Sequence, residues 1–403
     1  MYKLTNIRIL TCNGEEIEVG EVLFNEDVII DVGKQVSMED PKIKIIDGSG
    51  MTVLPGLIDS HVHLGMDASP DPFASMKDEG PVEIALKAVQ QGHEFLKAGI
   101  TSVRNLGTRD NVDISYRDSV EAGQIEGPRV FAAGRPIVMT GGHGHVMAIE
   151  ADGCDEARKA ARTQLKAGAD LLKVMATGGV LTKGNEPGAT QFTEEEMRCI
   201  CQEAANVSKT TAAHTIGTEG IKNAIRAGVT TIEHAYLLDE EAVDLMLQKG
   251  TFLVPTLLAP RLILDKDGAV PKYMIGKVKK IIDDHKVSFQ MAYQNGVPIA
   301  AGTDAGTPFN VPGLLVDELQ LMVEYGMKPH EALYSATFGA AKAVRMEGEI
   351  GSIDIGKAAD LIIVNGNPIE DIEQLRHPVY VFSRGRLVHE KTSHINTHHE
   401  LKV

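Results

Sequence analysis

From about residue 52, short apolar runs alternate with helix-length amphipathic stretches, and this alternation restricts the fold more than any other feature of the chain. Such runs fit strands that are buried on both faces, and the stretches between them fit helices that cover a parallel sheet. The runs predict strands at 53–62, 101–106, 129–134, 171–176, 210–215, 231–235, 252–257 and 298–303. Eight β/α repeats favour a closed (β/α)8 TIM barrel, an α/β fold, over an open sheet.

The two ends of the chain have the pattern of a smaller β domain. Residues 1–52 alternate apolar and polar residues in short runs, and Asn13-Gly14 is suited to a hairpin turn. Strand-like runs return at 350–353, 360–364 and 379–382. We therefore predict a discontinuous β-sandwich domain from residues 1–52 and 346–403, beside a barrel at 53–345. The polar, His-rich stretch from residue 394 onward is predicted to be a loosely docked tail.

Composition indicates a soluble globular protein. Of its 403 residues, 43% are hydrophobic and 24% charged, and no stretch approaches the ~20 apolar residues of a membrane span. The formal net charge of −16 disfavours nucleic-acid and membrane partners, because both present negative charge. The N-terminus lacks the pattern of a secretory signal. We expect a cytoplasmic homo-oligomer whose cysteines, Cys12, Cys154, Cys199 and Cys201, are reduced thiols.

Two histidines end the first predicted barrel strand, in Ile58-Asp59-Ser60-His61-Val62-His63. Residues two apart on a strand point to the same face, so both imidazoles can reach one metal ion. The alternative is that the two histidines merely decorate a polar strand end.

Lys173 interrupts the apolar run Leu171-Leu172-Lys173-Val174-Met175. A free ammonium is costly to bury, so one interpretation pairs it with a buried carboxylate. The other is that desolvation lowers its pKa, the neutral amine captures carbon dioxide, and the resulting carbamate bridges two metal ions.

Three further polar residues end predicted strands: His214, His234 and Asp304. A histidine at such a position is often a hydrogen-bonded structural residue, and an aspartate often caps a turn. Barrel enzymes, however, assemble their active sites at the C-terminal ends of the strands. Asp304 there could be both a metal ligand and the general base that returns a proton to a leaving amine.

In chain order, these residues resemble the amidohydrolase superfamily across nearly the whole chain. The resemblance rests on Leu54 to His63, Lys173, His214, His234, Gly302-Thr303-Asp304 and the segment 351–362. It implies that His61, His63 and Asp304 hold one metal ion and that His214 and His234 hold a second. Carboxylated Lys173 and a hydroxide would bridge the two ions. Zinc is the metal that imidazole-rich ligation favours, with manganese, iron and cobalt as alternatives.

Within the superfamily, the segments 139–145, 172–179 and 233–236 resemble the branch of Xaa-Pro dipeptidases and related metal carboxypeptidases. Imidazolonepropionases are similar at the ends of the chain, but they typically use one metal ion and have no bridging lysine. Lys173 therefore argues against that activity.

A dipeptidase must also hold the substrate, and two residues are candidates for its carboxylate or scissile carbonyl. His143 lies in the glycine-rich loop Gly141-Gly142-His143-Gly144-His145, where the backbone can approach a ligand closely. Tyr236 follows His234 by two residues and can point in the same direction. The alternative for the loop of His143 is that it is simply a tight turn, and the alternative for Tyr236 is an ordinary packed tyrosine. Arg104 at the end of a strand fits a salt bridge across the barrel better than a substrate contact.

The residues and the resemblance together imply a binuclear hydrolase that cleaves the amide bond of dipeptides or N-acyl amino acids with a metal-bridging hydroxide. Hydrolysis of a cyclic amide or a lactone is the alternative within hydrolases. A catalytically silent barrel that serves as a binding protein is the alternative from another class, and the complete ligand set speaks against it.

Overall fold

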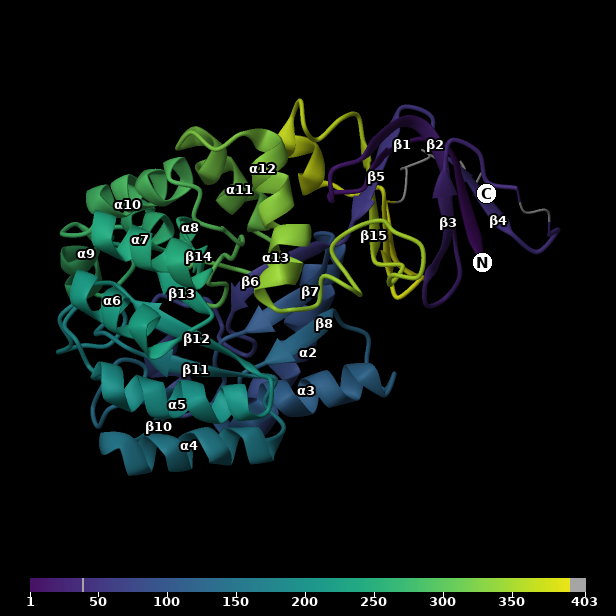
Figure 1. The fold of residues 1–403 in the computed structure, drawn as a ribbon. Coiled ribbons are helices and arrows are strands. Elements are labelled where there is room, and N and C mark those ends of the chain that lie inside the picture. The colour runs from purple at the N-terminus through teal and green to yellow at the C-terminus, as the bar shows by residue number, and fades with distance from the viewer. Residues whose placement is uncertain (38–39, 392–403) are drawn as a thin grey trace, which may run out of the picture.

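The computed structural model describes residues 1–37 and 40–391, so the predicted tail from residue 394 lies outside the described residues. A barrel forms the larger body, and a β-sheet domain lies at one side of it (Figure 1). The predicted fold class, a TIM barrel with a smaller β domain from both ends of the chain, is confirmed.

The barrel strands are parallel and lie in chain order. They are β6 (Leu57–Val62), β7 (Ile100–Asn105), β8 (Arg129–Ala132), β11 (Leu171–Met175), β12 (Thr210–Thr215), β13 (Thr231–His234) and β14 (Phe252–Val254), with the short β9 (Ile137–Val138) and β10 (Ile149–Glu150) beside β11. Every residue of β6, β7, β11, β12 and β13 is buried. Helices cover their outer faces and side chains fill the interior, as the apolar runs predicted.

The segment predicted as a strand at 298–303 closes the barrel through single bridges rather than as a continuous strand. Ile299 pairs with Leu253 of β14, and Ala305 pairs with Val62 of β6. The backbone N–H of Asp304 donates to the carbonyl of His61 at 2.7 Å. These bonds place Asp304 directly beside the strand that carries His61.

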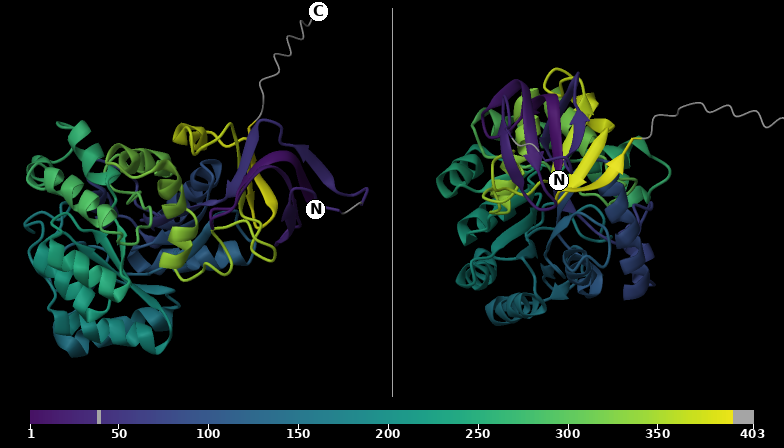
Figure 2. Two further views of the ribbon diagram at one scale, coloured as in Figure 1. Left: turned by 45° about the horizontal axis from the view of Figure 1, so that its top comes forward. Right: turned by 90° about the vertical axis from the view of Figure 1, so that its right-hand side faces the viewer.

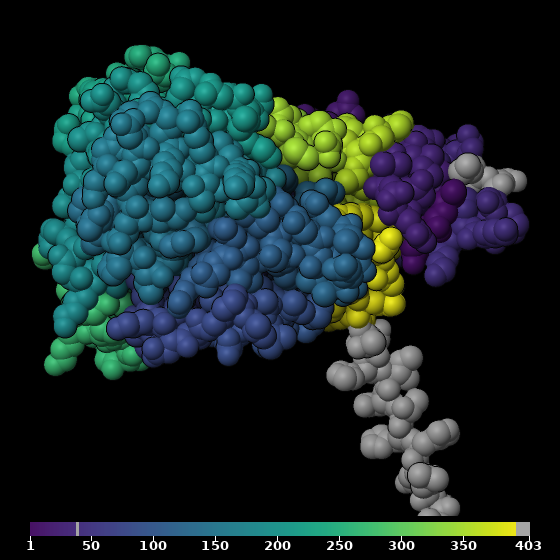
Figure 3. Space-filling view, turned by 90° about the horizontal axis from the view of Figure 1, so that it is seen from below, coloured from purple at the N-terminus to yellow at the C-terminus, as the bar shows by residue number. Residues whose placement is uncertain are grey.

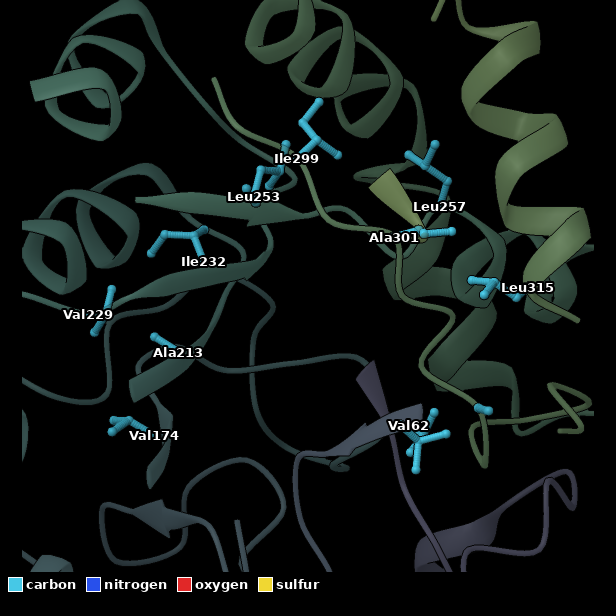
Figure 4. Close-up of a cluster of buried hydrophobic side chains, with 14 of the residues drawn as sticks. Val62, Val174, Ala213, Val229, Ile232, Leu253, Leu257, Ile299, Ala301 and Leu315 are labelled. Atoms are coloured by element: carbon cyan, nitrogen blue, oxygen red, sulfur yellow. The ribbon is translucent and has the colours of Figure 1, made fainter. Parts of the chain in front are cut away.

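Helices surround the barrel, and their inner faces pack against the strands to form its apolar core. They are α2 (Pro81–Lys97), α3 (Val112–Glu121), α4 (Gly153–Ala167), α5 (Glu194–Asn206), α6 (Thr218–Ala227), α7 (Glu240–Lys249), α10 (Ile282–Gln294) and α11 (Leu315–Glu324), followed by α12 (Pro329–Ser335) and α13 (Phe338–Ala343). Figure 4 shows strand residues of this core, including Val174, Ile232 and Leu253. Two helices that follow β14, α8 (Leu258–Asp265) and α9 (Lys272–Val278), pack with residues that follow β11, β12 and β13.

The β domain takes strands from both ends of the chain. It contains β1 (Tyr2–Leu10), β2 (Glu16–Phe24), β3 (Ile29–Gly33), β4 (Lys44–Asp47), β5 (Met51–Pro55), β15 (Leu361–Asn365), β16 (Tyr380–Ser383) and β17 (Arg386–Glu390). Antiparallel pairing of β5 with β15 joins the two halves (Figure 2). Figure 3 shows the C-terminal part, in yellow, between the N-terminal strands and the barrel.

Two sequence-based expectations change here. The run at 53–62 is divided at Gly56, so that β5 belongs to the β domain and β6 to the barrel. Residues 350–353, predicted as a strand, instead form bends at 350–352 and an irregular segment at 353. Ile353 is nevertheless buried in the apolar core of the β domain, which explains its strand-like apolar pattern.

The prediction of four reduced thiols is wrong for two cysteines. Cys154 of α4 and Cys199 of α5 form a disulfide with a Cα–Cα distance of 5.8 Å, whereas Cys12 and Cys201 are free. Cys201, two residues after Cys199 on α5, is buried and takes no part in the disulfide. The partner of Cys199, 45 residues away, is supplied by the packing of α4 against α5.

In residues 1–37 and 40–391, none of the helices combines the length and the apolar character that crossing a membrane requires.

Candidate metal centre

All the residues predicted to bind metal or substrate line one cavity at the C-terminal ends of the barrel strands. His61 and His63 come from β6 and the residue after it, Lys173 from β11, His214 from β12, His234 from β13 and Asp304 from the closing segment. His143 and Tyr236 line the same cavity. The barrel topology therefore gathers side chains that are up to 243 positions apart in the sequence, the distance from His61 to Asp304.

His61, His63 and Asp304 form a compact group of potential ligands. Oδ1 of Asp304 lies 3.3 Å from Nε2 of His61 and 3.2 Å from Nε2 of His63. One ligand atom from each residue lies within 4.8 Å of the other two. Asp304 and His234 both have positive φ angles, 63° and 73°, a conformation that non-glycine residues rarely adopt and that is concentrated at functional sites.

Hydrogen bonds to Nδ1 orient the imidazoles so that Nε2 faces the cavity. Nδ1 of His61 lies 2.9 Å from Glu233, Nδ1 of His63 lies 3.0 Å from the carbonyl of Gly107, and Nδ1 of His234 lies 2.7 Å from the hydroxyl of Thr256. Metal-binding histidines typically use such a partner to fix the ring. Burial lowers the pKa of His61 and of His234 well below the usual value, which favours the neutral form that binds metals.

Lys173 and His214 carry buried nitrogens that lack a partner. Among the residues that the structure describes, none forms a hydrogen bond with Nζ of Lys173 or Nε2 of His214. Lys173 is 1% exposed, and burial lowers its pKa to about 8. The His214 ring lies 4.6 Å from the His234 ring, centroid to centroid. An unsatisfied buried nitrogen is costly, so these two atoms fit a bound group that would complete their interactions.

A buried ion pair supports the site from within the barrel. Nη2 of Arg104 donates to both carboxylate oxygens of Glu233, at 2.9 and 3.0 Å. Nη1 donates to Thr231 at 2.8 Å, and Nε donates to the carbonyl of Ser60 at 2.6 Å. Arg104 therefore makes the salt bridge across the barrel that the sequence favoured. Because it holds Glu233, which contacts Nδ1 of His61, it also helps to position the His61 ring.

Sequence reasoning missed two carboxylates that position the site, Glu233 and Asp59. Asp59 accepts the backbone N–H groups of His61 and Thr303 at 3.2 and 3.0 Å and the Thr303 hydroxyl at 2.6 Å. It thereby joins β6 to the segment that carries Asp304. Each carboxylate lies in a buried strand within two residues of a predicted ligand, and this proximity to His61 or His234 is the signal that could have identified it.

The predicted substrate residues differ in their surroundings. His143 is buried, and its ring centroid lies 4.5 Å from that of His214. Burial lowers the pKa of His143 to about 3, so its ring is neutral at physiological pH. Tyr236 packs between His234 and His285, with ring centroids 6.0 and 3.9 Å away. The neighbouring His145 is exposed and does not line the cavity.

Apolar side chains make up most of the remaining cavity wall. They are Met66, Phe73, Met147, Met175, Val180, Leu181, Ile216, Ala259, Pro260 and Ile263. Within the described part of the chain, Asp304 is the only carboxylate that lines the cavity and Lys173 the only lysine or arginine. The wall therefore suits an uncharged, apolar group next to the polar centre.

Comparison with known proteins identifies the class of protein to which this barrel and its site belong. Residues 52–388 match the Amidohydrolase family, and the chain belongs to it. It is a hydrolase that acts on carbon–nitrogen bonds.

Individual relatives agree with the predicted branch. The chain is 30% identical to ochratoxinase from Aspergillus niger over 409 residues, which cover 93% of this chain and 84% of the relative. A solved Xaa-Pro dipeptidase with methionine bound in its active site is 35% identical, with a TM-score of 0.89, over 97% of this chain and 100% of the other. A prolidase complexed with N-methylphosphonate-L-proline is 31% identical, with a TM-score of 0.90 and the same coverage. The resemblance to the prolidase-like branch is confirmed.

Proposed function

We propose that this amidohydrolase uses two divalent metal ions to cleave the amide bond of dipeptides or N-acyl amino acids, as a dipeptidase or carboxypeptidase does. The observation that carries the proposal is the convergence of six side chains on one buried cavity: His61, His63, Lys173, His214, His234 and Asp304. Hydrogen bonds to Nδ1 orient three of the four histidines, His61, His63 and His234. Similarity to a Xaa-Pro dipeptidase and to a prolidase supports the choice of substrate.

In this proposal the donor set is shared between two ions. His61, His63 and Asp304 would hold the first and His214 and His234 the second, while a carbamate on Lys173 would bridge them. The buried Nζ of Lys173 supports this role, because a pKa of about 8 leaves part of the amine neutral and able to react with carbon dioxide. Imidazole-rich ligation favours zinc. When bound, the ions would supply a hydroxide nucleophile at neutral pH and polarise the scissile carbonyl.

The chain's own residues would handle the proton and the substrate. Asp304 would accept the proton of the attacking water and deliver it to the departing nitrogen, a step that amide cleavage needs because an amide anion is a poor leaving group. His143 and Tyr236 would hold the substrate's carboxylate or its scissile carbonyl. The apolar wall that includes Phe73 and Met175 would accept an uncharged side chain or acyl group.

Metal analysis and a substrate panel test the proposal. The purified protein should hold about two metal ions per chain, and Lys173→Ala should lower that number and the activity together. Full activity of this variant with one metal ion would overturn the bridged centre. Dipeptides and N-acyl amino acids with apolar side chains should be cleaved fastest, whereas activity confined to cyclic amides or lactones would overturn the proposed substrate class.

The homo-oligomeric state and the cytoplasmic location also stay predictions. The disulfide between Cys154 and Cys199 weighs against the second, because cytosolic thiols are generally kept reduced. Sedimentation equilibrium of the purified protein would decide the first.

A further inference from the structure

Helix α9 holds a loop of the cavity wall through a series of consecutive backbone carbonyls. Nζ of Lys277 donates to the carbonyl oxygens of Gly179 at 3.0 Å, Val180 at 3.3 Å and Thr182 at 2.7 Å. The hydroxyl of Tyr273 donates to the remaining carbonyl, that of Leu181, at 2.8 Å. Lys277 is only 8% exposed. A lysine ammonium has three N–H donors, so it matches three converging carbonyl oxygens that would otherwise repel one another.

The same loop residues contact His143. The Thr182 hydroxyl lies 2.9 Å from Nδ1 of His143 and accepts the backbone N–H of Gly144 at 3.0 Å. Gly179 lies against the ring, since a Cβ built at Gly179 would be 2.5 Å from Nε2 of His143. Both loop residues that touch His143 thus have their carbonyls bound to Lys277.

The hydrogen bonds of the Thr182 hydroxyl also favour one tautomer of His143. One lone pair of this oxygen accepts the Gly144 N–H, and the hydroxyl proton then has Nδ1 of His143 as a well-placed acceptor. In a neutral imidazole, an accepting Nδ1 leaves the proton on Nε2. His143 would thus present an N–H donor, which suits a carboxylate or carbonyl oxygen of a substrate.

We propose that Lys277 is a positioning residue for substrate binding: it binds the carbonyls of Gly179, Val180 and Thr182 and so holds His143 with its Nε2–H available to the substrate. Lys277 itself does not line the cavity, so it acts through the loop rather than by contact. The inference rests on the proposed function only in taking His143 as a substrate-binding residue.

Kinetics of Lys277→Met provide the first test, since methionine keeps much of the side-chain volume and removes every donor. We expect KM to rise about 10- to 100-fold with little change in kcat, because misplacing a binding group by about 1 Å has effects of this size. Metal content should stay that of the wild type. Lys280→Met is the matched control: Lys280 is exposed and bonds Glu186 in the same region at 2.8 Å, yet it contacts none of the four carbonyls. Its KM should change less than about twofold.

A combined variant tests whether the effect passes through His143. If it does, adding Lys277→Met to His143→Gln should raise KM no further than His143→Gln alone. Additive effects, an equal effect of Lys280→Met, or a loss of metal from Lys277→Met would each overturn the proposal. Tyr273→Phe removes only the hydrogen bond to the Leu181 carbonyl and should raise KM by a smaller factor than Lys277→Met. This variant provides a test if Lys277→Met does not fold.

Nitrogen NMR of protein with 15N-labelled histidine gives a readout that needs no turnover. The His143 signals, identified by their loss in His143→Gln, should show an unprotonated Nδ1 and a protonated Nε2 in the wild type and a mixture of tautomers in Lys277→Met. A proton on Nδ1 in the wild type would overturn the inference. If no dipeptide or N-acyl amino acid is cleaved, the proposed function fails while the NMR result still decides the role of Lys277.

Discussion

Replacing Arg104 with methionine should destabilise the protein strongly, because it leaves Glu233 as a buried carboxylate without its cation. Arg104 and Glu233 are 1% and 0% exposed at their side chains, and two hydrogen bonds of 2.9 and 3.0 Å join them. The substitution also removes donors from the Thr231 hydroxyl and the Ser60 carbonyl. Glu233 would keep its contacts with His61 and Thr231 but lose its neutralising partner.

Removing one partner of a buried ion pair typically costs about 3–5 kcal/mol, because the remaining charge is left uncompensated in a medium of low dielectric constant. We expect a loss of this size in the free energy of unfolding. We also expect metal affinity to fall about 10- to 100-fold, since Glu233 orients His61 and groups that orient a metal ligand have effects of this order.

Urea unfolding of the metal-free protein, followed by circular dichroism, measures the loss in stability; the chain has no tryptophan to report on it. Metal must be removed, since bound metal would add to the stability of the folded state. Arg226→Met is the matched control because Arg226 pairs with Glu241 at 2.6 Å on the surface, with side chains 35% and 56% exposed. Arg226→Met should lower the free energy of unfolding by less than about 1 kcal/mol.

A loss in Arg104→Met no larger than that of the control would refute this reasoning. A second variant checks the cause: combining Arg104→Met with Glu233→Leu removes the uncompensated charge and should recover part of the lost stability. If the combined variant is less stable than Arg104→Met alone, the destabilisation comes from lost packing or lost hydrogen bonds rather than from the charge.

Three further predictions concern the disulfide, a buried acid and the metal. Reduction of the disulfide, or Cys154→Ser, should lower the free energy of unfolding measured in urea by up to about 4 kcal/mol, as expected for a cross-link over 45 residues. Thiol titration of the denatured oxidised protein should count two free thiols. Burial raises the pKa of Glu318 to about 8, so the folded protein binds a proton there that the unfolded chain releases at lower pH. The contribution of Glu318 to stability should thus be lost as the pH rises from about 5 to about 9, and Glu318→Gln should flatten this part of the stability profile; a profile equally steep in the variant would contradict this. Dialysis against a chelator should abolish activity and zinc should restore it, whereas activity that survives complete metal removal would contradict a metal-dependent reaction.

Much of the candidate site could be predicted from the sequence because its residues are polar and stand within or at the ends of strand-like runs. His61, His63, His214, His234 and Asp304 end apolar runs whose C-terminal ends meet at one mouth in a parallel barrel, so their proximity follows from the fold class. Lys173 was identifiable because an ammonium inside an apolar strand needs a special environment.

The partners of the buried polar groups could not be predicted in the same way. Arg104 was expected to bridge the barrel, but its partner Glu233 lies 129 positions away, and the closure of the barrel determines which carboxylate it meets. Cys154 and Cys199 were misjudged for the same reason, because only the packing of α4 on α5 brings the two sulfurs together. Lys277 gave no signal, since a lysine in an amphipathic helix ordinarily points to solvent.

The sequence by itself determined the barrel, the small β domain and the set of metal-binding candidates, because apolar periodicity and strand-end chemistry are local properties. The tertiary structure alone decided how those candidates are oriented: Glu233, Gly107 and Thr256 turn the Nε2 atoms toward the cavity, and Lys277 holds the loop around His143. Hydrogen bonds of this kind require two distant segments to be placed to within a few tenths of an ångström, and no local sequence pattern encodes that placement.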